Sequence, residues 1–351
     1  MLSGKTVLLS ARSGIPQAAE MLRAGGTVAF PTETVYGLGS NALDATAVAK
    51  IFEAKERPGW DPVIVHVCDR EMLERVAEVS GDFGLRVKDL MEAFWPGPLT
   101  LLLPRTAAVP DEVTAGRPLV GVRMPAHPVA LELIRTAGVP VAAPSANRFG
   151  RTSPTTAAHV LEDLDGRIDA VLDGGPTAVG VESTVIGPAE DGLGWVIYRP
   201  GGVSREMLES VCGPVDVFRP GEAVRAPESL PSPGVGMRHY APRARLVLVS
   251  QSQGAVEQAL TPVIDTLSET VVEIGVMLPD GWDASCAAFV YRWGPWGDGE
   301  MLARRLFAGL RELDEAGASV IVCPVPEMGG IGEAIRDRLR KASRKAAAGE
   351  G

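Results

Sequence analysis

Short apolar segments bounded by glycine and proline recur along the first 200 or so residues of the chain. Segments of this length and composition predict β-strands. They cover residues 25–30, 62–67, 98–104, 118–124, 170–173, 183–187 and 195–200. Between several of them the apolar residues recur with helical spacing, as in 44–56 and 127–138, and Asp44 is placed to cap the first of these helices. The alternation predicts an α/β domain with a twisted mixed sheet.

The pattern changes near residue 211. Prolines crowd the stretch 213–242, and no helical or strand period survives there, which predicts an inter-domain linker. Beyond it, apolar segments again alternate with amphipathic ones and predict a smaller, Rossmann-like α/β domain. Its strands are expected at 244–250, 271–278, 287–293 and 319–326, and its helices near 252–267, 299–316 and 331–345. The predicted divisions are 1–210, a linker over 211–243, and 244–351.

Composition narrows the class of protein. The 351 residues carry a formal net charge of −10, so most of the surface is expected to repel nucleic acid and anionic membranes. No apolar run reaches the roughly 18 residues of a membrane span, and the opening residues are too polar for a secretory signal. The four cysteines are scattered, as is typical of reduced thiols in the cytoplasm. We therefore expect a soluble cytoplasmic protein.

Three familiar motifs are imitated but incomplete. SGKT (3–6) lacks the upstream glycine of a P-loop, and GLGSNA (37–42) is separated from its strand by Pro31 and a polar TET. The four histidines have no zinc-binding spacing, so no resident metal site is predicted.

Cations and small hydroxyls gather instead in turns beside the predicted strand ends. Because α/β folds bind ligands in such loops, and because the protein is acidic overall, these cations indicate an anionic ligand. The side chains are Thr32, Thr34, Tyr36, Lys55, Arg57, Arg123, Ser145, Asn147, Arg148, Arg151, Ser183, Thr184 and Arg199.

Each of these residues also has a purely structural interpretation. Lys55 and Arg57 could complement a helix C-terminus, which we expect to face solvent. Arg123 could form a buried ion pair, His66 could be a core histidine, and the Ser and Asn residues of the loop at 143–155 could cap or turn the chain.

Ordered strings favour the functional interpretation. PTETVYGLG, K-x-RP, WPGPLT, VRMPAHP, APSAN, SPT, DGG, VEST and RPG follow one another in the order found in YrdC-like threonylcarbamoyl-AMP synthases, and the chain resembles that family over nearly its whole length. SPGVGMRHYAP (232–242), followed by a second α/β domain, resembles its longer, two-domain branch.

The resemblance implies the site residues position by position. Thr34, His66, Arg123 and Ser183 match positions around threonine, with Arg123 the partner of its carboxylate. Nucleotide contacts are implied for Lys55, Arg57, Leu119, Ala143, Ser145, Asn147, Ser153, Arg199 and Tyr240. Asp61 stands where the family usually has Asn, and its expected role is a nucleotide or metal contact. The family uses Mg²⁺ together with ATP.

The implied activity is L-threonylcarbamoyladenylate synthesis from L-threonine, bicarbonate and ATP, with release of pyrophosphate. The product would pass to a threonylcarbamoyl-transferase machinery that modifies tRNA, without stable tRNA binding by this chain. The linker over 211–243 is expected to act as a lid that keeps water from the labile product. Two alternatives remain: a threonine and ATP sensor without turnover, and an RNA-binding module, against which the net charge argues.

Overall fold

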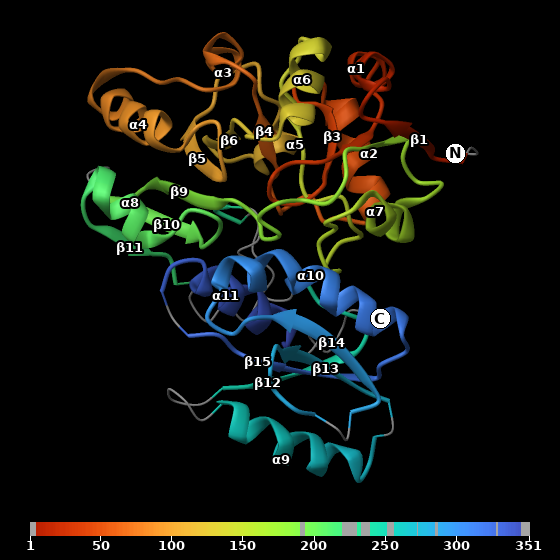
Figure 1. Ribbon diagram of the computed structural model, residues 1–351. Coiled ribbons are helices and arrows are strands. Elements are labelled where there is room, and N and C mark those ends of the chain that lie inside the picture. The colour runs from red at the N-terminus through yellow and green to blue at the C-terminus, as the bar shows by residue number, and fades with distance from the viewer. Residues whose placement is uncertain are drawn as a thin grey trace. The chain divides into compact units, whose positions relative to one another are not determined.

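The computed structural model describes residues 5–189, 194–219, 230–232, 239–250, 256–271, 273–284, 287–327 and 329–344 (Figure 1). The chain forms two compact units. The first comprises 1–149, 154–178 and 182–236, and the second comprises 237–351 with two short segments, 150–153 and 179–181. Residues 220–229 and 233–238, which make up much of the predicted linker and lid, lie outside the described residues.

The first unit is built on a mixed sheet whose strands run in the order β1-β8-β2-β3-β7-β4-β6-β5-β9-β10-β11. β4 pairs in parallel with β6, and β6 pairs antiparallel with β5. The C-terminal ends of β4 and β6 therefore lie beside the N-terminal end of β5. The strands are β1 (Val7–Ser10), β2 (Val28–Phe30), β3 (Gly37–Asn41), β4 (Ile64–His66), β5 (Leu99–Pro104), β6 (Leu119–Arg123), β7 (Val141–Ala142), β8 (Ala170–Asp173), β9 (Thr184–Pro188), β10 (Trp195–Arg199) and β11 (Val215–Val217).

Helices follow most of these strands, and α1 and α6 pack against each other. The predicted cap of α2 is present, since the Asp44 carboxylate accepts from the backbone N–H groups of Thr46 and Ala47. The helices are α1 (Ile15–Arg23), α2 (Ala45–Lys55), α3 (Arg70–Val76), α4 (Gly81–Phe94), α5 (Asp111–Thr114), α6 (Pro128–Ala137), α7 (Ala157–Leu164) and α8 (Arg205–Cys212).

All the strands predicted in the first unit are present, and β1, β3, β7 and β11 are additional. β3 escaped prediction because its sequence is GLGSN rather than an apolar run. A Cβ on Gly39 would lie 2.7 Å from both a Phe30 and a Val141 side-chain carbon, so glycine is what allows β3 to fit between β2 and β7. β11 occupies part of the segment that was predicted as the start of the linker.

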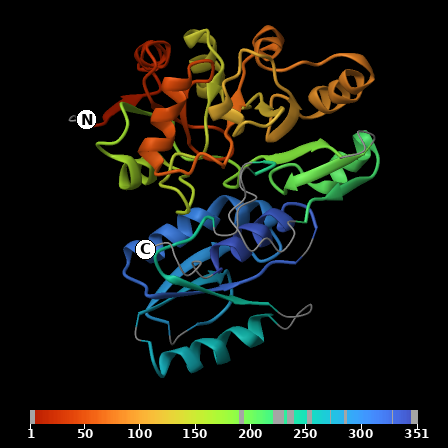
Figure 2. The ribbon, with the colours of Figure 1, turned by 180° about the vertical axis from the view of Figure 1, so that it is seen from behind.

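The second unit holds a four-stranded parallel sheet in the order β12-β15-β13-β14, as expected of a Rossmann-like domain. α9 covers one face of this sheet, while α10 and α11 lie on the other, as both views of the ribbon show (Figure 2). The elements are β12 (Arg245–Val249), α9 (Val256–Ser268), β13 (Ile274–Pro279), β14 (Phe289–Gly294), α10 (Gly299–Glu315), β15 (Val320–Pro324) and α11 (Gly332–Ala342).

Candidate functional site

The candidate site lies on one face of the central strands of the first unit. Val120 and Val122 of β6 belong to the main core, whereas Leu119 packs with Ile64 in a separate small cluster. Because side chains alternate along a strand, Arg123 lies on the Leu119 side of β6. His66 is the register partner of Arg123 on the neighbouring β4. The face opposite the core therefore carries two of the residues predicted to bind threonine.

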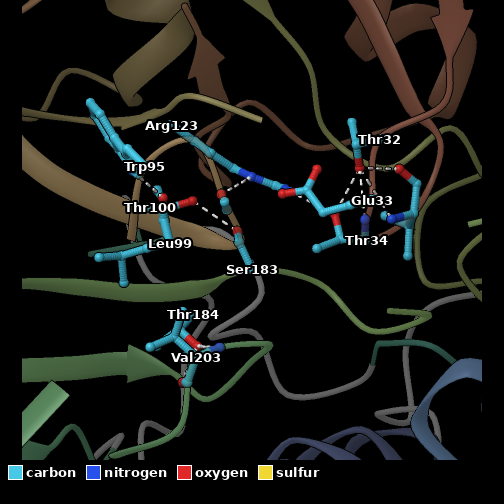
Figure 3. Close-up of polar contacts among 12 residues, drawn as sticks. Thr32, Glu33, Thr34, Trp95, Leu99, Thr100, Arg123, Ser183, Thr184 and Val203 are labelled. Atoms are coloured by element: carbon cyan, nitrogen blue, oxygen red, sulfur yellow. Dashed lines mark hydrogen bonds and ion pairs between the residues drawn. The ribbon is translucent and has the colours of Figure 1, made fainter. Parts of the chain in front are cut away.

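Arg123 is the centre of a buried polar network (Figure 3). The residue is 3% exposed, and its guanidinium bonds to three groups. Nε donates to the Gly97 carbonyl at 3.1 Å, Nη1 donates to Thr34 Oγ1 at 2.9 Å, and Nη2 lies 2.6 Å from a carboxylate oxygen of Glu33. These interactions fix the plane of the guanidinium, as bidentate recognition of a carboxylate requires.

The turn between β2 and β3 presents Thr34 to Arg123. Thr32 Oγ1 lies 2.8 Å from Thr34 Oγ1 and donates to the Val35 carbonyl at 2.7 Å. The Thr34 and Val35 N–H groups in turn donate to Thr32 Oγ1. This local side-chain bonding holds the TET sequence in a single conformation without helix or strand.

Ser183, the residue before β9, forms a second set of polar contacts. Its Oγ lies 2.8 Å from Thr100 Oγ1, on the strand next to β6, and accepts from Arg199 Nη2 at 3.1 Å. Arg199 also donates twice to the Ser183 carbonyl. A Cβ on Gly201 would lie 2.3 Å from the backbone of Ser183 and Thr184, so the glycine of RPGG allows the chain after β10 to pass this close.

His66 is buried against the Phe30 ring, which it meets edge-on at 6.2 Å. Burial, followed by the positive charge of Arg123, lowers the pKa of His66 to about 3. The imidazole is therefore neutral at physiological pH. Of the two neighbouring side chains, Arg123 therefore carries the positive charge and His66 is neutral. A neutral imidazole ring can donate or accept one hydrogen bond toward a ligand.

This lowered pKa predicts an acid-sensitive fold. Between about pH 6.5 and 3 the unfolded chain binds a proton at His66 that the folded chain does not, so the free energy of unfolding should fall as the pH falls through this range. Replacing His66 with Phe removes this titrating group, so the free energy of unfolding should depend less on pH in the variant. Urea unfolding at pH 4.5, 5.5 and 7 measures this dependence. An unchanged pH dependence in His66→Phe would contradict the assignment.

Lys55 ends α2 and is 1% exposed, which corrects the expectation that this helix end faces solvent. The loop at 143–149 folds over it. Lys55 Nζ donates to the Ser145 carbonyl at 2.5 Å and also to the Asn147 carbonyl, while the Lys55 carbonyl accepts from the Phe149 N–H. Burial and the neighbouring Arg57 lower the pKa of Lys55 well below its usual value.

Arg57 is likewise buried, at 8% exposure, and it contacts Asp61. Its Nη2 lies 3.0 Å from the Asp61 carboxylate, and the guanidinium also donates to the Asp61 and Pro62 carbonyls. The acid that stands in place of the family's Asn is thus the charge partner of Arg57. A nucleotide phosphate would meet an arginine whose charge is already partly balanced.

The backbone of Tyr36 joins the two groups of residues. The Ala146 N–H donates to the Tyr36 carbonyl at 2.8 Å, and Ser145 forms an isolated antiparallel β-bridge with Gly37. The turn that carries Thr34 therefore pairs directly with the loop that Lys55 anchors. The structure brings Thr34 and Arg123 into one network, Ser183 and Arg199 into a second one, and Lys55, Ser145 and Asn147 into a third, which adjoins the first.

Other predicted residues are less closely connected. Ala143 is fixed in the adjoining backbone by donating its N–H to the Ile64 carbonyl at 2.8 Å, whereas Leu119 lies at the opposite end of β6 from Arg123, about 13 Å away at the usual rise per residue. Ser153 and Tyr240 belong to the second unit, where the Tyr240 ring stacks on Phe307 at 5.8 Å. Their nucleotide contacts stay predictions.

Two residues of these polar networks were not predicted from the sequence. Glu33 lies within the PTETVYGLG string, and Thr100 lies in a strand that was recognised only for its leucines. A search for the acid that balances a buried Arg123 would have pointed to Glu33, because the string holds a carboxylate between two threonines.

No three His, Cys, Asp or Glu side chains among the described residues gather as a metal-binding cluster. Within the same part of the chain, no helix has both the length and the hydropathy to cross a membrane.

Comparison with known proteins places these observations in a family. Residues 20–201 match the Sua5, YciO and YrdC family model, described as telomere recombination, and residues 203–344 match the model described as threonylcarbamoyl-AMP synthase, C-terminal domain. A threonylcarbamoyl-AMP synthase from Pyrococcus abyssi is 42% identical over 96% of this chain and 98% of its own length. Its counterpart from Bacillus subtilis is 43% identical over 94% and 92%. The crystal structure of P. abyssi Sua5 complexed with L-threonine superposes with a TM-score of 0.88 at 42% identity, covering 96% of this chain and 98% of that one.

Proposed function

This chain belongs to the threonylcarbamoyl-AMP synthase family in its two-domain form, and we propose that it makes threonylcarbamoyl-AMP and pyrophosphate from L-threonine, bicarbonate and ATP. The observation that carries the proposal is the buried Arg123 network, a rigid carboxylate receptor whose turn pairs with the Lys55-anchored loop. An amino acid and a nucleotide need two such neighbouring sets of polar groups.

In the proposed reaction the threonine ammonium loses a proton, the neutral amine attacks CO₂ derived from bicarbonate and releases a second proton, and the resulting N-carboxylate attacks the α-phosphate of ATP. The P–O bond to pyrophosphate breaks as the new P–O bond forms. This transfer depends mainly on positioning and charge stabilisation. Arg123, Thr34 and Ser183 would orient threonine, and Arg57 with the 143–149 loop would orient the phosphates.

Mg²⁺ would enter with ATP, because Mg²⁺ usually retains water and binds through substrate phosphates as well as one or two carboxylates. It would neutralise phosphate charge. Asp61 is the acid predicted near the phosphates, and its carboxylate is already 3.0 Å from Arg57. We therefore assign Asp61 to Arg57 rather than to the metal.

We also propose a cytoplasmic setting and a downstream enzyme that transfers the threonylcarbamoyl group to tRNA. Cys68, Cys212 and Cys323 are free thiols, in keeping with a reducing compartment.

The function is tested by incubating the protein with ATP, Mg²⁺, bicarbonate and each amino acid in turn, and by measuring pyrophosphate and the adenylate. Threonine-dependent release of both products is expected. Binding of threonine and ATP without pyrophosphate release would indicate a sensor. Retention of tRNA at low salt without either product would indicate an RNA-binding module.

Threonine should be preferred over serine in this assay. A pocket that holds the extra methyl group gains only about 1–3 kcal/mol, so kcat/KM should differ by roughly 10- to 200-fold. Competition between the two amino acids at equal concentration measures this ratio directly. Equal rates would contradict a pocket shaped around the methyl group.

A further inference from the structure

The carboxylate of Glu33 is placed where a substrate carboxylate is expected to bind. Glu33 is 8% exposed, and its Oε1 lies 2.6 Å from Arg123 Nη2. The negative charge is held there because Arg123, by charge and hydrogen bonding, lowers the pKa of Glu33 against the opposing effect of burial, which is the largest single contribution. A receptor built only for a carboxylate would not place a second carboxylate on its arginine.

The charge balance of the pair favours a different kind of ligand. Arg123 and Glu33 together are neutral, so a simple anion gains little net attraction from them. A zwitterion gains from both, because its carboxylate meets the guanidinium and its ammonium meets Glu33. Arg123 has five N–H groups, and its hydrogen bonds to Gly97 and Thr34 use two of them. Nη2 forms an ion pair with Glu33 but makes no hydrogen bond among the described residues, so its N–H groups are left to receive a substrate carboxylate.

We propose that Glu33 binds the α-ammonium group of threonine, so that the Arg123–Glu33 ion pair recognises the amino acid as a zwitterion. The two charged groups of an amino acid are attached to one carbon atom. A carboxylate seated on Arg123 therefore brings the ammonium group within reach of the adjacent Glu33 carboxylate. Glu33 is in this account a specificity-determining residue of the proposed synthase, and the inference rests on the proposed use of threonine.

The decisive experiment compares two ligands by calorimetry, L-threonine and 3-hydroxybutanoate, which differ only in the amino group. The unmodified protein should bind threonine at least tenfold more tightly. In Glu33→Gln, threonine affinity should fall by tenfold or more, as expected for the loss of one charged hydrogen bond. Affinity for 3-hydroxybutanoate should stay the same or rise, because Arg123 then carries an unbalanced positive charge.

The ratio of the two affinities separates recognition from support of the fold. If Glu33 only orders Arg123, both ligands weaken together in Glu33→Gln and the ratio is unchanged, which overturns the proposal. Asp61→Asn is the matched control, since it also removes a buried carboxylate paired with an arginine, and its ratio should equal that of the unmodified protein.

Two further outcomes keep the test decisive. If Glu33→Gln lacks a melting transition, Glu33→Asp replaces it, and this variant should lower the ratio because its shorter side chain reaches the ammonium group less well. Equal affinities of the unmodified protein for the two ligands would refute the proposal without any variant. Absence of threonine binding and of pyrophosphate release in the unmodified protein would instead refute the proposed function.

Discussion

Arg123→Met is expected to raise the threonine concentration needed for half-maximal rate by roughly 30- to 5,000-fold. Removing one partner of a charged hydrogen bond in a buried site costs about 2–5 kcal/mol, and each 1.4 kcal/mol corresponds to tenfold. Methionine keeps the apolar stem of the side chain but donates no hydrogen bond to a carboxylate. The ATP requirement should change much less, because Arg123 bonds to Thr34, Glu33 and Gly97 rather than to the Lys55-anchored loop.

This substitution also leaves Glu33 as a buried carboxylate without its cation, which destabilises a fold by about 3–5 kcal/mol. The double variant Arg123→Met with Glu33→Gln removes both charges and should recover most of the melting temperature. It should not recover threonine affinity. Arg105→Met is a control at a more exposed ion pair, since Arg105 pairs with Asp111 at the opposite end of the β5–β6 ladder. Equal effects of Arg123→Met on both substrates would mean that Arg123 only supports the fold.

The sequence predicted the strands that surround this site because each is a compact apolar run bounded by glycine or proline. β3 was hidden because its residues are selected by close packing against Phe30 and Val141, which a local pattern does not reveal. The candidate site residues came largely from family motifs. From the sequence, Arg123 had two possible roles, an ion pair or a carboxylate receptor. The structure shows the ion pair, with Glu33, and the receptor role stays a prediction.

The sequence could not predict the surroundings of Lys55. A lysine at a helix C-terminus is usually exposed and favourable there, and nothing within α2 indicates otherwise. Its partners, the carbonyls of Ser145 and Asn147, lie about 90 residues further along the chain. Long-range backbone contacts of this kind are fixed by tertiary structure, and the hydropathy pattern carries no signal for them. The burial of Lys55 changes what its removal should do.

The Lys55→Met variant should form much less adenylate and should also be less stable than the unmodified protein. The Ser145 and Asn147 carbonyls lose a buried donor, which costs about 1–3 kcal/mol for each unsatisfied group. Removing a buried charge offsets part of that cost, so we expect a net fall of roughly 3–10 °C in melting temperature. With the 143–149 loop released from α2, the rate of pyrophosphate release should fall by about 100-fold or more. Threonine binding measured without ATP should change little.

The pH dependence of stability distinguishes a buried lysine from an exposed one. Because burial lowers the pKa of Lys55 in the folded state, the unfolded chain binds the extra proton between that lowered value and the ordinary 10.5. The unmodified protein should therefore gain stability as the pH rises toward 10.5, and Lys55→Met should lack this gain. Lys50→Met is the matched control on the same helix, where an exposed lysine donates to one carbonyl, that of Gly25. It should keep both activity and the alkaline gain. If Lys55→Met shows the full gain in stability at alkaline pH, Lys55 is exposed to solvent in the folded protein. If Lys55→Met releases pyrophosphate at the normal rate, neither Lys55 nor the 143–149 loop is part of the nucleotide site.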